Sequence, residues 1–239
     1  MLVPEWPAPS NVKCLMTRRT GGVSQAPWTS LNLGDHVGDD PAHVAANRAR
    51  LRRFLPAQPG WLNQVHSARV VDLDKQRTDL EADASFTRQT AQICAVLTAD
   101  CLPVLFCDRA GSVVAAAHAG WRGLADGVLE ATVAAMQVPP GEVLAWMGAA
   151  IGPQAFEVGD EVRQAFIAQQ AEAATAFVPQ PTPGKWLADI YQLARIRLQH
   201  AGVQAIYGGG RCTFNEADSF YSYRRDGVTG RMASLIWLE

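Results

Sequence analysis

The sequence is poor in charged residues, and its positive residues do not outnumber its negative residues. Of 239 residues only 18% are charged, and 21 Lys plus Arg against 23 Asp plus Glu leave a net charge of −2. A chain without a broad positive field has little to attract a phosphate backbone, so we expect no nucleic-acid partner. No window of about 18 uncharged apolar residues occurs, and the N-terminus lacks the pattern of a secretion signal. We therefore expect a cytoplasmic protein without a membrane segment.

Cysteine and histidine are also scarce, with five of each. The cysteines are scattered and odd in number, which does not resemble a disulfide framework. Reduced thiols are expected, and one of them could take part in chemistry. Because 48% of the residues are hydrophobic, the chain can bury a substantial core, and disorder is excluded as its main state.

Periodicity predicts strands and helices in mixed order. Apolar runs favour strands at 93–106, 113–117, 143–147, 203–207 and 232–238. Helical spacing favours helices at 42–54, 124–136, 160–170 and 187–200. The first two strands are interpreted as a buried hairpin, and the proline-rich segment 178–184 as a surface loop. An α/β or α+β fold follows, covering residues 1–239 as one domain.

Two residues stand near predicted strand ends, where α/β folds place functional groups. His118 follows the apolar run 113–117 and precedes Ala119 and Gly120. Cys101 is followed by Pro103, which predicts a bulge or a strand end beside the sulfur. In one unbroken strand, Cys94 and Cys101 would lie on opposite faces.

His66 ends the segment 61–66, in which strand alternation would put Gln64 and His66 on one face. Each of the three residues also has an ordinary interpretation: a core histidine for His118, a small buried side chain for Cys101 and a solvated histidine for His66. Their separations of 35 and 17 residues match no short metal motif. His36, His43 and His200 are assigned no chemistry.

If these residues met, two imidazoles and a thiolate would form a three-ligand site for Zn²⁺ with a fourth position open. The same set would suit copper, with a methionine as a weak axial ligand. The sequence by itself leaves both metals open.

Several motifs resemble the YfiH-type proteins, a family also named polyphenol oxidase or laccase-domain proteins. The resemblance covers nearly the whole chain. It is carried by Gly21-Gly-Val-Ser24, Ser30-Leu-Asn-Leu-Gly34, Gln64-Val-His66, Leu97-Thr-Ala-Asp-Cys-Leu-Pro103, Ala116-Ala-His-Ala-Gly-Trp-Arg-Gly123, Ile151-Gly-Pro153 and Phe220-Tyr-Ser-Tyr-Arg-Arg225. One departure is Arg18, which stands where the family usually has threonine, whereas Arg19 fits the motif.

The resemblance implies that His66, Cys101 and His118 are zinc ligands and take part in catalysis. It implies a single mixed α/β domain of layered sheets flanked by helices. The activity implied is zinc-dependent phosphorolysis of purine nucleosides (adenosine, inosine, guanosine and methylthioadenosine), together with adenosine deamination. The partners expected are therefore a purine nucleoside and phosphate.

Substrate-binding residues are implied less strongly. Asn32, Arg48 and Arg19 resemble positions that approach the nucleoside or the phosphate in related proteins, and the turn 119–123 could add backbone amides. The alternative is a turn asparagine and solvated arginines. Arg122 in the same turn is interpreted as an anchor at a helix start.

Other functions stay open on the sequence. Five histidines are too few for the trinuclear cluster of a multicopper oxidase, although copper in the His₂Cys site would allow weak oxidation. Editing of cell-wall precursors is a second enzymatic alternative. A metal-free hydrolase with Cys101 as nucleophile and His118 as base is a third. A zinc-holding docking domain would ordinarily have four protein ligands, whereas only three are found here.

Overall fold

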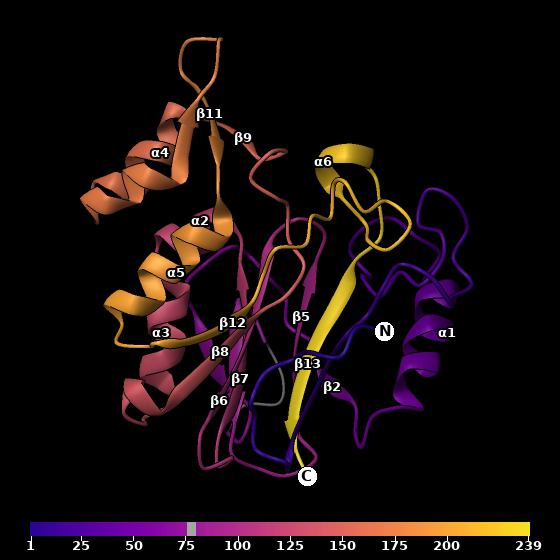
Figure 1. The fold of residues 1–239 in the computed structure, drawn as a ribbon. Coiled ribbons are helices and arrows are strands. Elements are labelled where there is room, and N and C mark those ends of the chain that lie inside the picture. Colours follow the sequence, from indigo (N-terminus) through magenta and orange to yellow (C-terminus); the bar gives the residue numbers. More distant parts are fainter. Residues whose placement is uncertain (76–79) are drawn as a thin grey trace.

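The structure, a computed structural model, describes residues 1–75 and 80–239. Its elements form layers (Figure 1). Helices α3 (Val128–Ala135) and α5 (Ile190–His200) cover one side, two β-sheets lie in the middle, and α1 (Pro41–Arg52) covers the other side. This arrangement confirms the predicted mixed α/β class with sheets flanked by helices.

The larger sheet has six strands in the order β12-β8-β6-β7-β4-β3. These are β3 (Val70–Asp72), β4 (Ala84–Thr87), β6 (Leu102–Asp108), β7 (Val114–Ala119), β8 (Val143–Met147) and β12 (Ala205–Gly208). Alternate residues of β6 pack into two different apolar clusters. Val104 and Phe106 pack with α3 and α5, while Leu105 and Cys107 pack toward the smaller sheet. Burial on both faces explains why the central strands are continuous apolar runs.

The smaller sheet has the order β1-β13-β5-β2. Its strands are β1 (Val12–Met16), β2 (Pro59–Gly60), β5 (Ile93–Thr98) and β13 (Met232–Leu238). One face packs on the six-stranded sheet, and the other receives Leu51 of α1. Helix α1 is capped by Asp40, whose carboxylate accepts a hydrogen bond from the Ala42 amide at 2.8 Å.

The remaining elements lie around these layers. A three-stranded sheet is formed by β9 (Glu157–Gly159), β10 (Phe177–Pro179) and β11 (Lys185–Ala188). The other helices are α2 (Trp121–Ala125), α4 (Asp160–Ile167), α6 (Tyr223–Asp226) and two 3-10 turns at Pro140–Glu142 and Ala171–Ala176. Among the described residues, no helix combines the length and the apolar character needed to cross a membrane.

The prediction of one strand over 93–106 is wrong. β5 ends at Thr98 in the four-stranded sheet, and β6 begins at Leu102 in the six-stranded sheet. The buried hairpin consists of β6 and β7 alone. The inference that Cys94 and Cys101 occupy opposite faces of one strand therefore does not hold.

The physical reason for this break is Asp100. Its φ of 92° lies in the left-handed region, which no strand residue adopts. Its carboxylate accepts hydrogen bonds from the Thr213 hydroxyl at 2.6 Å and the Arg224 amide at 2.7 Å. These distant partners hold the turn that carries the chain from one sheet to the other.

Two predicted helices also need correction. The segment 124–136 forms α2 and α3 rather than one helix, because Gly127 adopts a φ of 94° between them. The segment 187–200 is helical only from Ile190, since Leu187 belongs to β11.

Two smaller predictions differ as well. No strand runs through 61–66, where His66 has a φ of 62°. The segment 178–184 is not entirely a loop, because Val178 and Pro179 pair with β11 before the chain turns.

Candidate metal centre and its cavity

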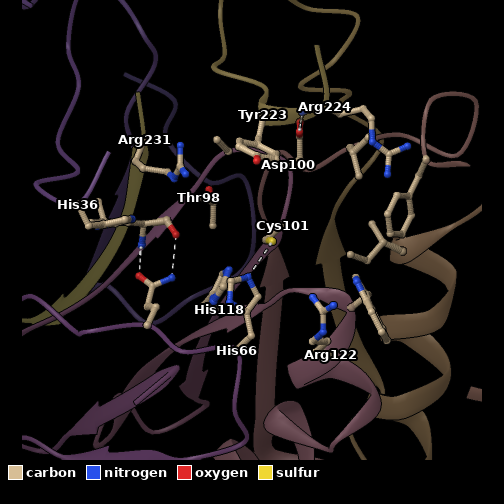
Figure 2. A pocket seen from close by; sticks show the side chains of 17 residues that line it. His36, His66, Thr98, Asp100, Cys101, His118, Arg122, Tyr223, Arg224 and Arg231 are labelled. Atoms are coloured by element: carbon tan, nitrogen blue, oxygen red, sulfur yellow. Dashed lines mark hydrogen bonds between the residues drawn. The ribbon is translucent and has the colours of Figure 1, made fainter. Parts of the chain in front are cut away.

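Three side chains that are far apart in the sequence meet beside the end of β7 (Figure 2). His66 lies between β2 and β3, Cys101 between β5 and β6, and His118 in β7. Their potential ligand atoms all lie within 4.8 Å of one another. The Cys101 Sγ is 3.9 Å from the His66 Nε2, and the two imidazole centroids are 4.8 Å apart. Sequence spacing alone could not show that these residues lie together, whereas the fold brings them into one cluster.

The Asp83 carboxylate, which sequence analysis did not single out, organises both histidines. It is fully buried and lies just before β4. It accepts hydrogen bonds from the backbone amides of Val65, His66 and Ser67 at 3.2, 3.0 and 2.6 Å, and from the Ser67 hydroxyl at 2.9 Å. Its Oδ1 also lies 2.8 Å from the His118 Nδ1. One side chain thus fixes the left-handed turn at His66 and the ring of His118.

This contact determines which nitrogen of His118 is available. With Nδ1 hydrogen-bonded to Asp83, the Nε2 atom is left for the cluster, an arrangement in which a carboxylate orients a metal-binding imidazole. Burial opposes ionisation of Asp83, yet hydrogen bonds from His118 and Ser67 lower its pKa to about 2.

Gly120 leaves room for the cluster. A Cβ at this position would lie 2.9 Å from the His66 Cδ2 and 3.0 Å from the Cys101 Sγ, so any side chain would displace one of them. The Ala119-Gly120 step between β7 and α2 is therefore a requirement of the site's packing. The sequence prediction that small residues follow His118 at a strand end agrees with this geometry.

The cluster favours an ionised thiol. Burial would raise the pKa of the Cys101 thiol, but the charge of His118 and hydrogen bonds with both imidazoles lower it to about 6. For His118, burial would lower the pKa, whereas the Cys101 thiolate and Asp83 raise it to about 9. Near neutral pH and without a metal, the two side chains form a thiolate–imidazolium pair.

The donor set fits a zinc ion. Zinc with tetrahedral ligands at about 2.0–2.1 Å for nitrogen and 2.3 Å for sulfur separates nitrogen from sulfur by about 3.5 Å. The observed 3.9 Å between Cys101 and His66 needs only a small adjustment. Copper prefers the same atoms, so the donor set does not choose between the two metals.

The cluster opens into a cavity of about 530 Å³. His118 is buried, Cys101 is half-buried and the ring of His66 is exposed, so the cluster is accessible from the cavity side. In Figure 2, Arg231 and His36 lie on one side of Cys101, and Arg122 and Arg224 on the other.

The Arg122 and Arg224 side carries aromatic residues. The guanidinium of Arg122 lies 4.5 Å from the ring centre of Trp121, and that of Arg224 lies 5.7 Å from that of Phe156. Ile151 and Ile190 add apolar surface to the cavity. Arg122, which the sequence suggested as a helix-start anchor, is the second residue of α2 and also lines the cavity.

The three residues expected to bind substrate lie outside this lining. Arg19 donates to the Thr29 and Ala217 carbonyls and stacks on Tyr221. Asn32 is fully buried, and its amide group is engaged by protein partners. Their proposed contact with substrate stays a prediction, and the structure does not bring them to the cluster.

Arg48 does not line the cavity, but it contacts Asp35, the neighbour of a lining residue. It forms an ion pair with Asp35 at 3.2 Å, donates to the Leu33 carbonyl at 3.0 Å and lies over Trp61. Asp35 precedes His36, which lines the cavity although sequence analysis assigned it no chemistry. A short polar motif with a histidine was the available signal, and it was too weak to interpret.

Fold and site together define a mixed α/β protein with a His–Cys–His cluster at the base of an open cavity. Residues 13–239 match the family model described as multi-copper polyphenol oxidoreductase laccase. The chain belongs to this family, as its motifs suggested.

Similar proteins extend the comparison over the whole length. The chain is 60% identical to a purine nucleoside phosphorylase of Pseudomonas aeruginosa, covering 100% of this chain and 98% of the relative. It is 56% identical to the purine nucleoside phosphorylase YfiH of Escherichia coli with the same coverage. A crystal structure of a Neisseria meningitidis protein superposes with a TM-score of 0.96 at 56% identity, covering 100% of this chain and 98% of that one.

Proposed function

We propose that this protein is a zinc-dependent purine nucleoside phosphorylase. The observation that carries the proposal is the convergence of His66, Cys101 and His118 at the base of a cavity, in a chain whose relatives are named purine nucleoside phosphorylases. The cavity volume falls within the roughly 300–1,000 Å³ typical of small-molecule sites.

The cavity walls suit the parts of a nucleoside. Trp121, Phe156 and Tyr223 offer flat or amphipathic surfaces against which a purine can stack. The side of the cavity that carries Arg231, His36 and Thr98 is polar and suits ribose and phosphate. The substrates proposed are adenosine, inosine, guanosine and methylthioadenosine, with phosphate as the second reactant.

The three ligands would hold the ion, with Asp83 retaining the proton on the His118 Nδ1. When bound there, zinc supplies a Lewis acid that polarises a substrate oxygen or lowers the pKa of a bound water, which serves glycosidic cleavage and adenosine deamination. We propose adenosine deamination as a second activity of the same site.

Phosphorolysis needs only the nucleoside and phosphate as reactants. A phosphate oxygen forms a bond to C1′ of the ribose while the bond from C1′ to the purine nitrogen breaks. The electron pair leaves with the purine, which takes up the proton released by hydrogen phosphate. The chain's residues hold the two reactants in line, so that binding contributes to the rate by orientation.

The test is turnover by protein of known metal content. Inosine and phosphate should yield hypoxanthine and ribose 1-phosphate in equal amounts, and product formation should stop when phosphate is omitted. Adenosine without phosphate should yield inosine and ammonia. Absence of product from every purine nucleoside, with zinc bound, would refute the proposed function.

A further inference from the structure

Arg231 is held in a fixed position at the edge of the cavity. Its backbone amide donates to the Asn32 Oδ1 at 2.9 Å, and its carbonyl accepts from the Leu33 amide at 3.2 Å. Its side-chain stem packs on Gly34, where an added Cβ would lie 2.8 Å from the Arg231 Cγ. The segment 32–34 thus holds this arginine through two hydrogen bonds and the packing of its side-chain stem.

Arg231 forms no ion pair within the described part of the chain, although Asp100 and Cys101 lie near enough to raise its pKa. Its Nη1 donates to the carbonyls of Thr229 and Gly230 at 3.0 and 3.1 Å, and its Nε and Nη2 have no hydrogen-bond partner among the described residues. Burial lowers its pKa, as expected for a cation removed from water without a paired carboxylate. The Nε–Nη2 edge is the edge that binds a phosphate or carboxylate with two parallel hydrogen bonds.

Thr98 offers a second unused donor in the same cavity. It is 1% exposed, and its hydroxyl has no hydrogen-bond partner among residues 1–75 and 80–239. It is the last residue of β5 and pairs with Met232, the residue after Arg231. Figure 2 shows Thr98 between Arg231 and Cys101. An unsatisfied buried hydroxyl is costly, so its presence beside a cavity indicates a ligand.

His36 adds a third polar group. It lines the exposed mouth of the cavity beside Arg231, and its Nδ1 lies 3.5 Å from the Asp35 carboxylate. Partial burial and the charge of Arg231 lower its pKa, while Asp35 opposes this shift. A neutral imidazole can donate one hydrogen bond to an anion without adding repulsion to the neighbouring guanidinium.

The other cavity arginines are engaged differently. Arg122 and Arg224 are exposed and stack on aromatic rings, and Arg224 also donates to the Glu157 carbonyl. Exposed cations are screened by solvent and salt, so they bind an anion less strongly than a half-buried one.

We propose that Arg231, the Thr98 hydroxyl and His36 form the subsite for inorganic phosphate. This inference rests on the proposed phosphorylase function and assigns the second reactant to one side of the cluster. The purine then lies on the opposite side, toward Trp121 and Phe156, and C1′ lies between them. Asn32, whose Oδ1 accepts from the Arg231 amide, serves the reaction as a positioning residue for Arg231.

The test compares Arg231→Gln and Thr98→Val with Arg109→Gln. Arg109 is a surface residue that faces Glu142 and does not line the cavity, so its variant controls for the loss of one positive charge. In inosine phosphorolysis, we expect Arg231→Gln to raise the phosphate KM about 10- to 100-fold and Thr98→Val about 3- to 10-fold. The inosine KM, the zinc content and the parameters of Arg109→Gln should stay close to wild type.

Phosphate binding is also measured without nucleoside, by calorimetry or by ³¹P line broadening with the zinc-loaded protein. Weaker phosphate binding in Arg231→Gln supports the subsite even if no nucleoside is cleaved, so failure of the proposed function is distinguished from failure of this inference. Unchanged phosphate binding and KM in Arg231→Gln would overturn it. If that variant does not fold, Arg231→Lys and Gly34→Ala give the same comparison, with a smaller rise in the phosphate KM expected for both.

Discussion

The two sides of the cavity differ in how their charges are balanced. At the cluster, the His118 imidazolium lies between two anions, the Cys101 thiolate and the Asp83 carboxylate, so the three groups together carry one negative charge. At the other side, Arg231 has no carboxylate partner in the described part of the chain. The first side can exchange protons for a cation, whereas the second side presents a guanidinium edge without a bonded partner to an anion.

One cavity can therefore bind ligands of opposite charge although the protein has no large net field. The chain as a whole is close to neutral, with a net charge of −2. Selectivity for the two ligands must therefore come from local burial and pairing, because the long-range potential favours neither. Variants of the cluster should therefore change zinc binding, whereas variants around Arg231 should change phosphate binding.

Removing a cluster ligand should have the largest effect. We expect Cys101→Ser and His118→Ala to lose bound zinc and to reduce kcat to below about a hundredth of wild type. Zinc binding and turnover both depend on the residues that contact the ion directly. Metal content by mass spectrometry and circular dichroism of the fold provide the measurement. Cys14→Ser makes the same chemical change outside the cavity and should keep zinc. Stoichiometric zinc in either ligand variant would show that the assignment is wrong.

Removing the charge of Asp83 should have the next largest effect. Asp83→Asn loses an acceptor that positions two ligands, so zinc affinity should fall about 10- to 100-fold, as measured by competition with a chelator. Asp108→Asn is a matched control, since Asp108 is also buried and accepts hydrogen bonds from Ser112 and Val113. The control should lower the free energy of unfolding but leave zinc affinity unchanged. Equal zinc affinity in both variants would contradict the role of Asp83.

Zinc affinity should rise with pH. The pKa of His118 is raised to about 9, so the metal must displace a proton from it at neutral pH, and affinity increases up to about pH 9. The Cys101 thiol, with its pKa lowered to about 6, is already ionised above that pH. Below pH 6 it also binds a proton, and the dependence should become steeper. A chelator competition series from pH 5 to about pH 10 measures this, and a flat profile between about pH 6 and 9 would contradict the assigned thiolate–imidazolium pair.

Arg48→Ala should give the smallest effect. Because Arg48 holds Asp35 next to His36, its loss should raise the phosphate KM about two- to fivefold and leave the metal in place. Arg50→Ala is a control on the same helix, since Arg50 donates to the Gly21 carbonyl away from the cavity. Steady-state kinetics at varied phosphate separates the two. Kinetics equal to wild type would remove Arg48 from the proposed machinery.

Local sequence signals predicted those elements whose stability comes from local pattern and burial. The strands 143–147 and 232–238 have the predicted bounds, and α1 is found near its predicted position. The boundary inside 93–106 was not predictable, since strands of two stacked sheets are equally apolar. What separates them is the contact of Asp100 with Thr213, 113 positions away.

The candidate site shows the same limit. His118 was predicted at a strand end, and the fold places it near the end of β7. The three cluster residues were connected by family resemblance only, because their spacing carries no local motif. Asp83 and Arg231 were missed because their roles depend on partners 16 to 35 and 199 positions away. A lone aspartate or arginine in an apolar context gives no local signal of such contacts.

The position of two cluster residues on connections between sheets has a thermodynamic consequence. His66 lies where the chain passes from β2 to β3, and Cys101 where it passes from β5 to β6, and both connections lead from the four-stranded to the six-stranded sheet. An ion held by both residues would clamp two inter-sheet connections at one point. Since such an ion binds the folded chain and not the unfolded one, loading the centre should raise the melting temperature of the whole protein, with docking of the two sheets as the linked process.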